Sequence, residues 1–362
     1  MSTSPATPAA DAAVAFGLDT FGDLTVDAAG APVPAHQVIR DVVEQGVLAD
    51  QVGIDHFSVG EHHRDDFAVS APDVVLAAVA ARTERITLGT AVTVLSSDDP
   101  VRVYERFATI DAISGGRAEI TVGRGSFVES FPLFGYELAD YEVLFEEKLD
   151  LLARLRAEGP TTWSGTTRAP LTGQRVHPTT ERGSLPVWVG VGGSPESVLR
   201  AARQEMPLML AIIGGAPARF RPFVDLFHRS TAQPLPVGIH SPGFVADTDE
   251  EALELLHPHF TANRDRIGRE RGWPAMTRAE YEREADGGAL FVGSPETVAR
   301  RIAAAVTDLG VQRFDLKYAN GTMPHEQLLH AIELYGTQVV PRVRALLGER
   351  AAAGAAPGRA DA

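Results

Sequence analysis

Short apolar runs alternate with longer segments of mixed polarity along most of this chain. The run Ile86-Thr87-Leu88-Gly89, for example, suits a strand that is buried on both faces of a parallel sheet. The same pattern predicts eight strands, at Val14–Leu18, Asp55–Gly60, Arg85–Val94, Arg117–Gly123, Pro186–Val191, Pro207–Ile213, Pro236–Ala246 and Arg313–Tyr318. A helical segment follows almost every strand, which indicates repeated strand–helix units around a parallel sheet.

The segments between the strands carry the start and stop signals of helices. Proline stands in the first turn of several, and Gly115-Gly116 stops the segment that begins at Pro100. Helices are expected at His36–Val52, Pro72–Thr83, Pro100–Ile113, Tyr141–Glu158, Pro195–Arg203, Ala216–Ser230, Pro295–Leu309 and Pro324–Leu347. About eight strand–helix units in a row favour a closed (β/α)8 barrel, or TIM barrel, over an open doubly wound sheet.

Two insertions interrupt the alternation. After the fourth helix, Thr161–His177 contains a tryptophan, glycines and a proline, and predicts a small β-hairpin. After the seventh strand a helix begins over Asp249–His257, and the charged stretch His259–Gly288 follows, broken by Gly272 and Pro274. Barrels carry substrate loops at this position, so the stretch is expected to be either a lid or a solvated surface excursion.

Composition bounds the domain count and the class of protein. The 362 residues are 44% hydrophobic, which is enough to bury a large core, and no linker-like change divides them. Residues 13–348 are therefore predicted to form one barrel domain, between disordered ends at 1–12 and 349–362. The formal net charge of -15 repels phosphate backbones, so no nucleic-acid partner is expected.

The absence of cysteine and the sequence of the first residues limit the kinds of site that the protein can have and its expected cellular compartment. The chain has no cysteine, which excludes disulfides, thiolate nucleophiles and cysteine-ligated zinc or iron–sulfur sites. The stretch Met1–Asp11 lacks the basic and apolar regions of a signal peptide, and no apolar run is long enough to cross a bilayer. A cytoplasmic protein without a membrane partner is expected.

The active sites of such barrels lie at the carboxyl ends of the strands, which directs attention to the second strand. It ends in Glu61-His62-His63, where imidazoles beside a carboxylate could serve acid–base or metal chemistry. The alternative is a polar loop with two ordinary histidines. No HxH or HExxH pattern stands at this strand end to support a metal, so no metal site is predicted.

Three other strand ends carry features that suit a flat, phosphorylated ligand. Small residues over Gly89–Ala91 would let a ring approach the backbone, or else mark a tightly packed strand. Arg124 between two glycines can hold a phosphate, or form a salt bridge at the rim. The turn Gly192–Ser194 opens a helix and suits a phosphate, although Ser294-Pro295 repeats the helix cap alone.

Taken together, these strand ends resemble the luciferase-like flavin-dependent monooxygenases. The resemblance covers roughly Phe16 to Leu346. It is carried by Gly60-Glu61-His62-His63, Gly89-Thr90-Ala91-Val92, Asp99-Pro100-Val101-Arg102, Ser114-Gly115-Gly116-Arg117, Gly123-Arg124-Gly125 and Leu185-Pro186-Val187-Trp188-Val189, in that order. Each piece alone is a weak signal, but the ordered set at successive strand ends is specific.

The resemblance implies a set of site residues. It places His62 near the reacting flavin, with Glu61 or His63 orienting it, and an imidazole there can change protonation near neutral pH. It places Thr90, Ala91 and Val92 against the flavin ring, often with a non-prolyl cis peptide bond. It assigns the FMN phosphate to Gly123 and Arg124, and to the turn formed by Gly192, Gly193 and Ser194.

The resemblance also implies an activity. Reduced FMN, supplied by a separate flavin reductase or regenerated with NAD(P)H, would react with molecular oxygen, so that one oxygen atom enters a small organic substrate and the other leaves as water. A homodimer is expected, through the helices Pro72–Thr83 and Pro100–Ile113. Three alternatives remain open: hydride transfer with FMN or a deazaflavin, flavin binding without catalysis, and metal-dependent hydrolysis. No GxGxxG strand–helix element indicates a Rossmann NAD domain.

Overall fold

Eight parallel strands close into a barrel in the computed structural model, which describes residues 14–125 and 127–355. They are β1 (Ala15–Thr20), β2 (His56–Val59), β3 (Thr87–Thr90) with its continuation β4 (Thr93–Val94), β5 (Ile120–Gly123), β8 (Val187–Val191), β9 (Leu208–Ala211), β10 (Val237–Val245) and β12 (Arg313–Lys317). Neighbours pair in the order β3-β2-β1-β12-β10-β9-β8-β5-β4. Backbone hydrogen bonds between Leu88 and the Arg117–Glu119 segment close the ring, so the predicted (β/α)8 barrel is confirmed.

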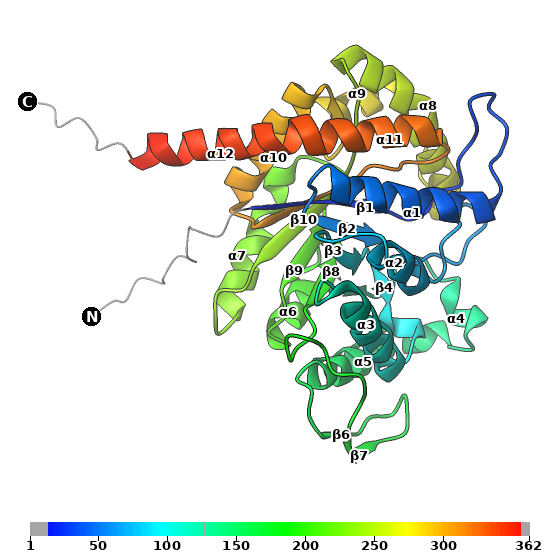
Figure 1. The fold of residues 1–362 in the computed structure, drawn as a ribbon, viewed down its shortest axis with the longest axis vertical. Coiled ribbons are helices and arrows are strands. Elements are labelled where there is room, and N and C mark those ends of the chain that lie inside the picture. The colour runs from blue at the N-terminus through cyan, green and yellow to red at the C-terminus, as the bar shows by residue number, and fades with distance from the viewer. Residues whose placement is uncertain (1–13, 126, 356–362) are drawn as a thin grey trace, which may run out of the picture.

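Helices cover the outside of the barrel, as Figure 1 shows. They are α1 (Ala35–Gln51), α2 (Pro72–Ala80), α3 (Pro100–Ser114), α4 (Ser130–Leu133), α5 (Tyr141–Leu155), α6 (Pro195–Arg203), α7 (Arg221–Ser230), α10 (Pro295–Leu309), α11 (His325–Leu334) and α12 (Val340–Ala355). Their ends follow local chemistry: the Asp99 carboxylate accepts a hydrogen bond from the backbone N–H of Val101 at 2.9 Å, and Gly115 ends α3 with a φ of 70°.

The helix predicted over Pro324–Leu347 is two helices joined by a π-helical turn, Tyr335–Val339. Because α12 continues to Ala355, residues 349–355 of the predicted disordered tail are helical. Residues 1–12 and 356–362 of the predicted ends lie outside the described part. No helix among the described residues is both long and apolar enough to cross a membrane.

Both predicted insertions are present. The hairpin consists of β6 (Thr161–Trp163) and β7 (Leu171–Gln174), and in Figure 1 it lies at the opposite end of the molecule from the second insertion. That second insertion is more regular than expected, with α8 (Asp249–Arg271), α9 (Arg278–Asp286) and the short strand β11 (Phe291–Gly293), which pairs with β10. The helix expected to end at His257 continues through Pro258 until Gly272 ends it with a φ of 70°.

The barrel lumen is polar at the end where the strands begin. Buried Arg313 forms ion pairs with Glu119 and, at 2.7 Å, with Asp315, while His56 lies 3.3 Å from Glu119. A Cβ at Gly17 would overlap the Asp315 carboxylate, so the glycine makes room for this cluster. Apolar strand residues, from Phe16 in β1 to Phe314 in β12, belong to the continuous core.

Candidate active site

His62 lies in an aromatic pocket where β2 ends at the barrel mouth. Its ring centroid is 4.8 Å from that of Phe21, 4.3 Å from that of Phe67 and 5.3 Å from that of Phe127. Burial, with the nearby charges of Lys317 and Arg64, lowers the pKa of His62 to about 3. The expectation that this imidazole changes protonation near neutral pH is therefore wrong: the ring is neutral there and offers only a hydrogen bond.

Glu61 and His63 point to different partners from those of His62. One carboxylate oxygen of Glu61 lies 2.9 Å from His63 Nε2, and the other accepts a hydrogen bond from the Val94 backbone N–H, also at 2.9 Å. Both oxygens are thus engaged, and Glu61 fixes the start of β4 and the orientation of His63. The two residues line a cavity of about 170 Å³ with a wall that includes Phe134, whereas His62 faces Phe21.

The third predicted strand is split where the resemblance places the flavin ring. The peptide bond between Ala91 and Val92 is cis, and it separates β3 from β4. The Thr90 hydroxyl is buried and donates to the Thr121 carbonyl at 2.8 Å, so it acts inside the barrel wall. A Cβ at Gly123 would lie 2.6 Å from Val92, which shows that the glycine makes room for that side chain.

Gly89, in contrast, makes room inside the barrel. A Cβ added there would lie 3.1 Å from side-chain atoms of Glu119 and Ser58. Of the two interpretations of Gly89, approach of a flat ring or a tightly packed strand, these contacts favour the packed strand. In this strand, Gly89 packs against side chains in the lumen, whereas Val92 packs against Gly123 at the mouth.

Arginine and serine side chains converge where β5 ends and α6 begins. Arg124 pairs with Glu142 and its guanidinium donates to the Ser197 hydroxyl at 3.3 Å. Arg200 pairs with the other oxygen of Glu142 at 2.7 Å. The Ser194 side chain caps the helix and lies 2.9 Å from that of Ser197. Two guanidinium groups, two hydroxyls and a helix N-terminus converge here, which are the donors that a phosphate requires.

The glycines before α6 leave space next to these donors. Nothing lies within 4 Å of a Cβ built on Gly192, while Gly193 has a φ of 99° and packs against Phe220. Gly192 is exposed, so the turn leaves room for a ligand beside these donors. Ser197 and Arg200 were not predicted from the sequence; their positions three and six residues after the Ser194 cap, on the first turns of the helix, were the available signal.

A second set of polar groups inside the mouth was also missed. Asp19 at the end of β1 lies 2.6 Å from Nδ1 of His240 in β10, and both side chains are buried. Lys317 in β12 pairs with Asp23 at 3.1 Å. The sequence feature that could have revealed Lys317 is the alternation of charged and apolar residues in Arg313–Lys317. Inward-facing positions of a strand recur every two residues, so the charged residues share one face.

The second insertion docks directly beside His62. Arg64, which follows the histidines, makes hydrogen bonds of 2.6 and 2.8 Å to the Glu270 carboxylate of α8. Arg266 pairs with Asp65. The guanidinium carbon of Arg64 lies 4.3 Å from the centre of the Phe127 ring, which itself contacts His62. The charged stretch predicted as a lid or a surface excursion is a helix held across the loop that carries His62.

Loosening this contact should expose the turn between α8 and α9 to protease. We expect Glu270→Gln to increase the rate of cleavage within residues 272–277 by about two- to fivefold, the scale of a partly exposed ion pair. Limited proteolysis followed by mass spectrometry measures this rate. Glu282→Gln, which pairs with Arg278 within α9 at 2.8 Å, is the matched control. Equal cleavage of wild type and Glu270→Gln would show that the ion pair does not hold the segment.

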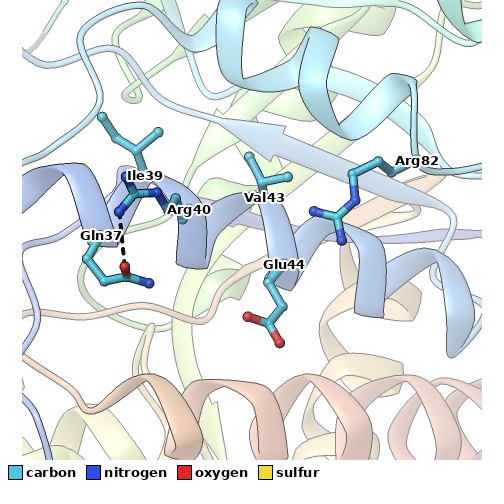
Figure 2. A pocket seen from close by; sticks show the side chains of 6 residues that line it. All are labelled: Gln37, Ile39, Arg40, Val43, Glu44 and Arg82. Atoms are coloured by element: carbon cyan, nitrogen blue, oxygen red, sulfur yellow. Dashed lines mark hydrogen bonds between the residues drawn. The ribbon is translucent and has the colours of Figure 1, made fainter.

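A larger hollow lies outside the barrel and is not part of this arrangement. It has a volume of about 570 Å³, and Figure 2 shows its wall along α1, with Arg82 from the end of α2. Glu44 of this wall also belongs to a group with Asp41 and His325, whose ligand atoms lie within 4.8 Å of one another in the part of the chain that the structure describes. This group lies on the helix layer, away from the strand ends.

Comparison with known proteins gives a family match over most of the chain. Residues 20–313 match the family described as luciferase-like monooxygenase. A curated relative, 4-hydroxyprotoasukamycin monooxygenase of Streptomyces nodosus subsp. asukaensis, is 36% identical over 34% of this chain and 33% of its own length. The chain spans about a third to about a half of the length of the curated relatives it matches.

Solved structures share the barrel. The oxygenating constituent of 3,6-diketocamphane monooxygenase from Pseudomonas putida, in complex with FMN, matches with a TM-score of 0.73 and 18% identity, over 91% of this chain and 99% of that one. An F420-dependent secondary alcohol dehydrogenase, in complex with an F420-acetone adduct, matches with a TM-score of 0.71 and 16% identity, over 91% and 99%. At these identities the likeness shows the fold.

Proposed function

Because the chain belongs to the luciferase-like monooxygenase family, we propose that it is an FMN-dependent monooxygenase that oxygenates a small organic substrate. The observation that carries the choice of cofactor is the convergence of Arg124, Arg200, Ser194 and Ser197 at the start of α6. A phosphomonoester would replace the Glu142 carboxylate between the two guanidinium groups. The residues present therefore fit FMN.

The roles of the chain's own residues follow from their contacts. When bound, reduced FMN supplies the electrons that activate molecular oxygen. The aromatic pocket of Phe21, Phe67 and Phe127 excludes water around His62, which offers a neutral hydrogen bond. Glu61 holds β4 through the Val94 N–H. Val92, seated against Gly123, presents an apolar surface at the mouth.

The experiment that tests the proposal identifies the cofactor and its reaction. We expect the protein to bind FMN in preference to riboflavin and a deazaflavin, and to consume oxygen when a separate NAD(P)H-dependent flavin reductase supplies reduced FMN. Substrate oxygenation is followed with 18O2 and mass spectrometry. Tight deazaflavin binding with reduction of a substrate in the absence of oxygen would instead support the hydride-transfer alternative. Flavin binding without turnover of any substrate in a broad panel would support a non-catalytic protein.

Arg124 should matter for the phosphate and not for the ring. A charge-assisted hydrogen bond contributes about 1.5–3 kcal/mol, so Arg124→Ala should weaken FMN binding by roughly tenfold to a hundredfold and leave riboflavin binding nearly unchanged. Fluorescence titration measures both ligands. Arg203→Ala on the same helix, whose exposed side chain pairs with Glu146 at 3.2 Å, is the control. An equal loss for both ligands would exclude Arg124 from the phosphate site.

We also propose a homodimer formed through α2 and α3. Each helix leaves one large apolar side chain in solvent: Val74 is 66% exposed and Ile113 is 49% exposed. Burial of their apolar surface in an interface would favour association. Light scattering after gel filtration should report a dimer, and Val74→Lys should shift it toward the monomer. A monomer at all concentrations would contradict this assembly.

A further inference from the structure

Two histidines with different partners neighbour the same ring at the barrel mouth. The ring centroid of Phe21 lies 4.8 Å from that of His62 and 6.2 Å from that of His240, and His240 is nearly parallel to it. The Lys317 ammonium lies 4.6 Å from the centre of the same ring. The aromatic pocket and the polar lumen therefore meet at Phe21.

Asp19 determines which nitrogen of His240 carries a hydrogen. The carboxylate oxygen lies 2.6 Å from Nδ1, and a carboxylate can only accept, so Nδ1 is the donor. Proton exchange is then confined to Nε2, as in other carboxylate–histidine pairs. The second oxygen of Asp19 has no hydrogen-bond partner within the described part of the chain.

The His240 side chain keeps some accessible surface although its strand is covered on both sides. All nine residues of β10 are buried, and the strand is flanked by β9 and β12. The His240 side chain nevertheless keeps 11% of its surface accessible, whereas that of Asp19 keeps 1%. Since Nδ1 is turned to Asp19, the accessible edge is available to a reactant inside the barrel.

The charges around the two rings differ in sign. Burial alone would lower the pKa of His240, but the Asp19 carboxylate and, further away, Asp315 outweigh both burial and Lys317, and raise it. The pKa of His62 is lowered instead, by burial and by the charges of Lys317 and Arg64. Two titratable groups whose pKa values are driven apart in one site mark a division between proton transfer and neutral hydrogen bonding.

We propose that His240, oriented by Asp19, is the proton donor of this active site, and that His62 provides a neutral hydrogen bond. This inference rests on the proposed function. In the step, the Nε2–H bond of the imidazolium breaks and an O–H bond forms on an oxygen of the reactant that has gained negative charge. The neutral ring takes its proton back from water, and no electrons pass through the histidine.

The first arm of the test needs no flavin. NMR titration of the histidine rings in the flavin-free protein, with His240→Gln to assign the signal, should give a pKa for His240 above the ordinary 6.5. Asp19→Asn preserves shape but removes the charge, so burial is then opposed only by Asp315, and the pKa of His240 should fall. A value at or below 6.5 in the wild type, or no change in Asp19→Asn, would overturn the proposal.

The second arm is kinetic. His240→Gln should lower coupled turnover by about 10²–10⁴-fold, while the Kd for FMN changes by less than about threefold. Wild-type activity should decline as pH rises through the pKa of His240, and this decline should be absent from the residual activity of the variant. His330→Gln removes a surface His–Asp pair of 3.2 Å and is the matched control. Asp19→Asn repeats the measurement if His240→Gln does not fold.

The outcomes separate the inference from the function on which it rests. If the wild type does not oxygenate any substrate with FMN, the proposed function fails, and the titration alone decides whether the Asp19–His240 pair exists. If the wild type oxygenates a substrate and His240→Gln retains wild-type turnover and its alkaline decline, the assignment of His240 is overturned. Loss of turnover together with loss of the pH dependence and an intact Kd supports it.

Discussion

Replacing Arg313 with methionine should lower the free energy of unfolding by about 3–5 kcal/mol, the cost of removing one partner from a buried ion pair. Arg313 is 1% exposed and pairs with both Glu119 and Asp315. Its loss leaves two carboxylates in the closed end of the barrel without their main counter-charge. Chemical denaturation followed by circular dichroism measures the change.

Arg344→Met is the matched control, because this arginine pairs with Asp55 at 2.9 Å with half of its side chain exposed. We expect it to cost less than about 1 kcal/mol. A similar small loss for Arg313→Met would show that the buried cluster contributes little to stability.

The same cluster predicts a pH dependence. Burial raises the pKa of Glu119, but Arg313 and His56 outweigh burial and hold the pKa well below its ordinary 4.5. A depressed pKa stabilises the fold above the unfolded-state value, and the contribution is lost as pH falls below about 4.5. The acid-induced loss of stability should therefore be smaller in Glu119→Gln than in the wild type. Identical slopes below pH 4.5 would contradict this.

Replacing His62 with alanine should lower coupled turnover by about 10²–10³-fold, the usual effect of removing one hydrogen-bond donor from a dry active site. Hydrogen peroxide release should rise, and FMN affinity should change by less than about tenfold. His62→Asn, which keeps a neutral donor, should recover part of the activity, since the pKa of about 3 leaves no proton to transfer near neutral pH. Steady-state oxygen consumption compared with product formation gives the coupled fraction.

The neighbouring His63 supplies the control for this result. It contacts Glu61 and, with ring centroids 5.0 Å apart, Phe134, so His63→Ala should affect turnover less than His62→Ala. Equal turnover and equal coupling in wild type and His62→Ala would show that His62 is a packing residue. Full loss in His62→Asn would favour a role that requires the imidazole itself.

The sequence predicts the barrel well because its signals are local. Apolar runs, proline at helix starts and glycine at helix ends specify each strand–helix unit without knowledge of its neighbours. The second insertion is misjudged for the same reason. Pro258 removes one helical hydrogen bond, but α8 continues because its later half is held by Arg64 and Asp65 of a distant loop.

The candidate site is predictable only in part. Residues that end strands, such as His62 and Arg124, can be found from their position alone. Arg200 meets Arg124 through the shared Glu142 carboxylate and the Ser197 hydroxyl, and Asp19 meets His240 past the intervening strand β12, 221 residues away in the chain. The pKa of His62 depends on its burial, to which Phe21 and Phe127 of other segments contribute. These are tertiary properties, and no local pattern encodes them.

Glu142 has a kinetic consequence for the proposed phosphate site. Its carboxylate, 60% exposed, bridges Arg124 and Arg200 and offsets part of their positive charge. An incoming phosphate must therefore displace the Glu142 carboxylate, which lowers the affinity for the phosphate. When the phosphate leaves, the carboxylate can take its place again. A protein that takes its flavin from another enzyme at each turnover benefits from such rapid exchange. In the proposed phosphate site, the residence time of FMN would thus depend on Glu142 as well as on the groups that bind the phosphate.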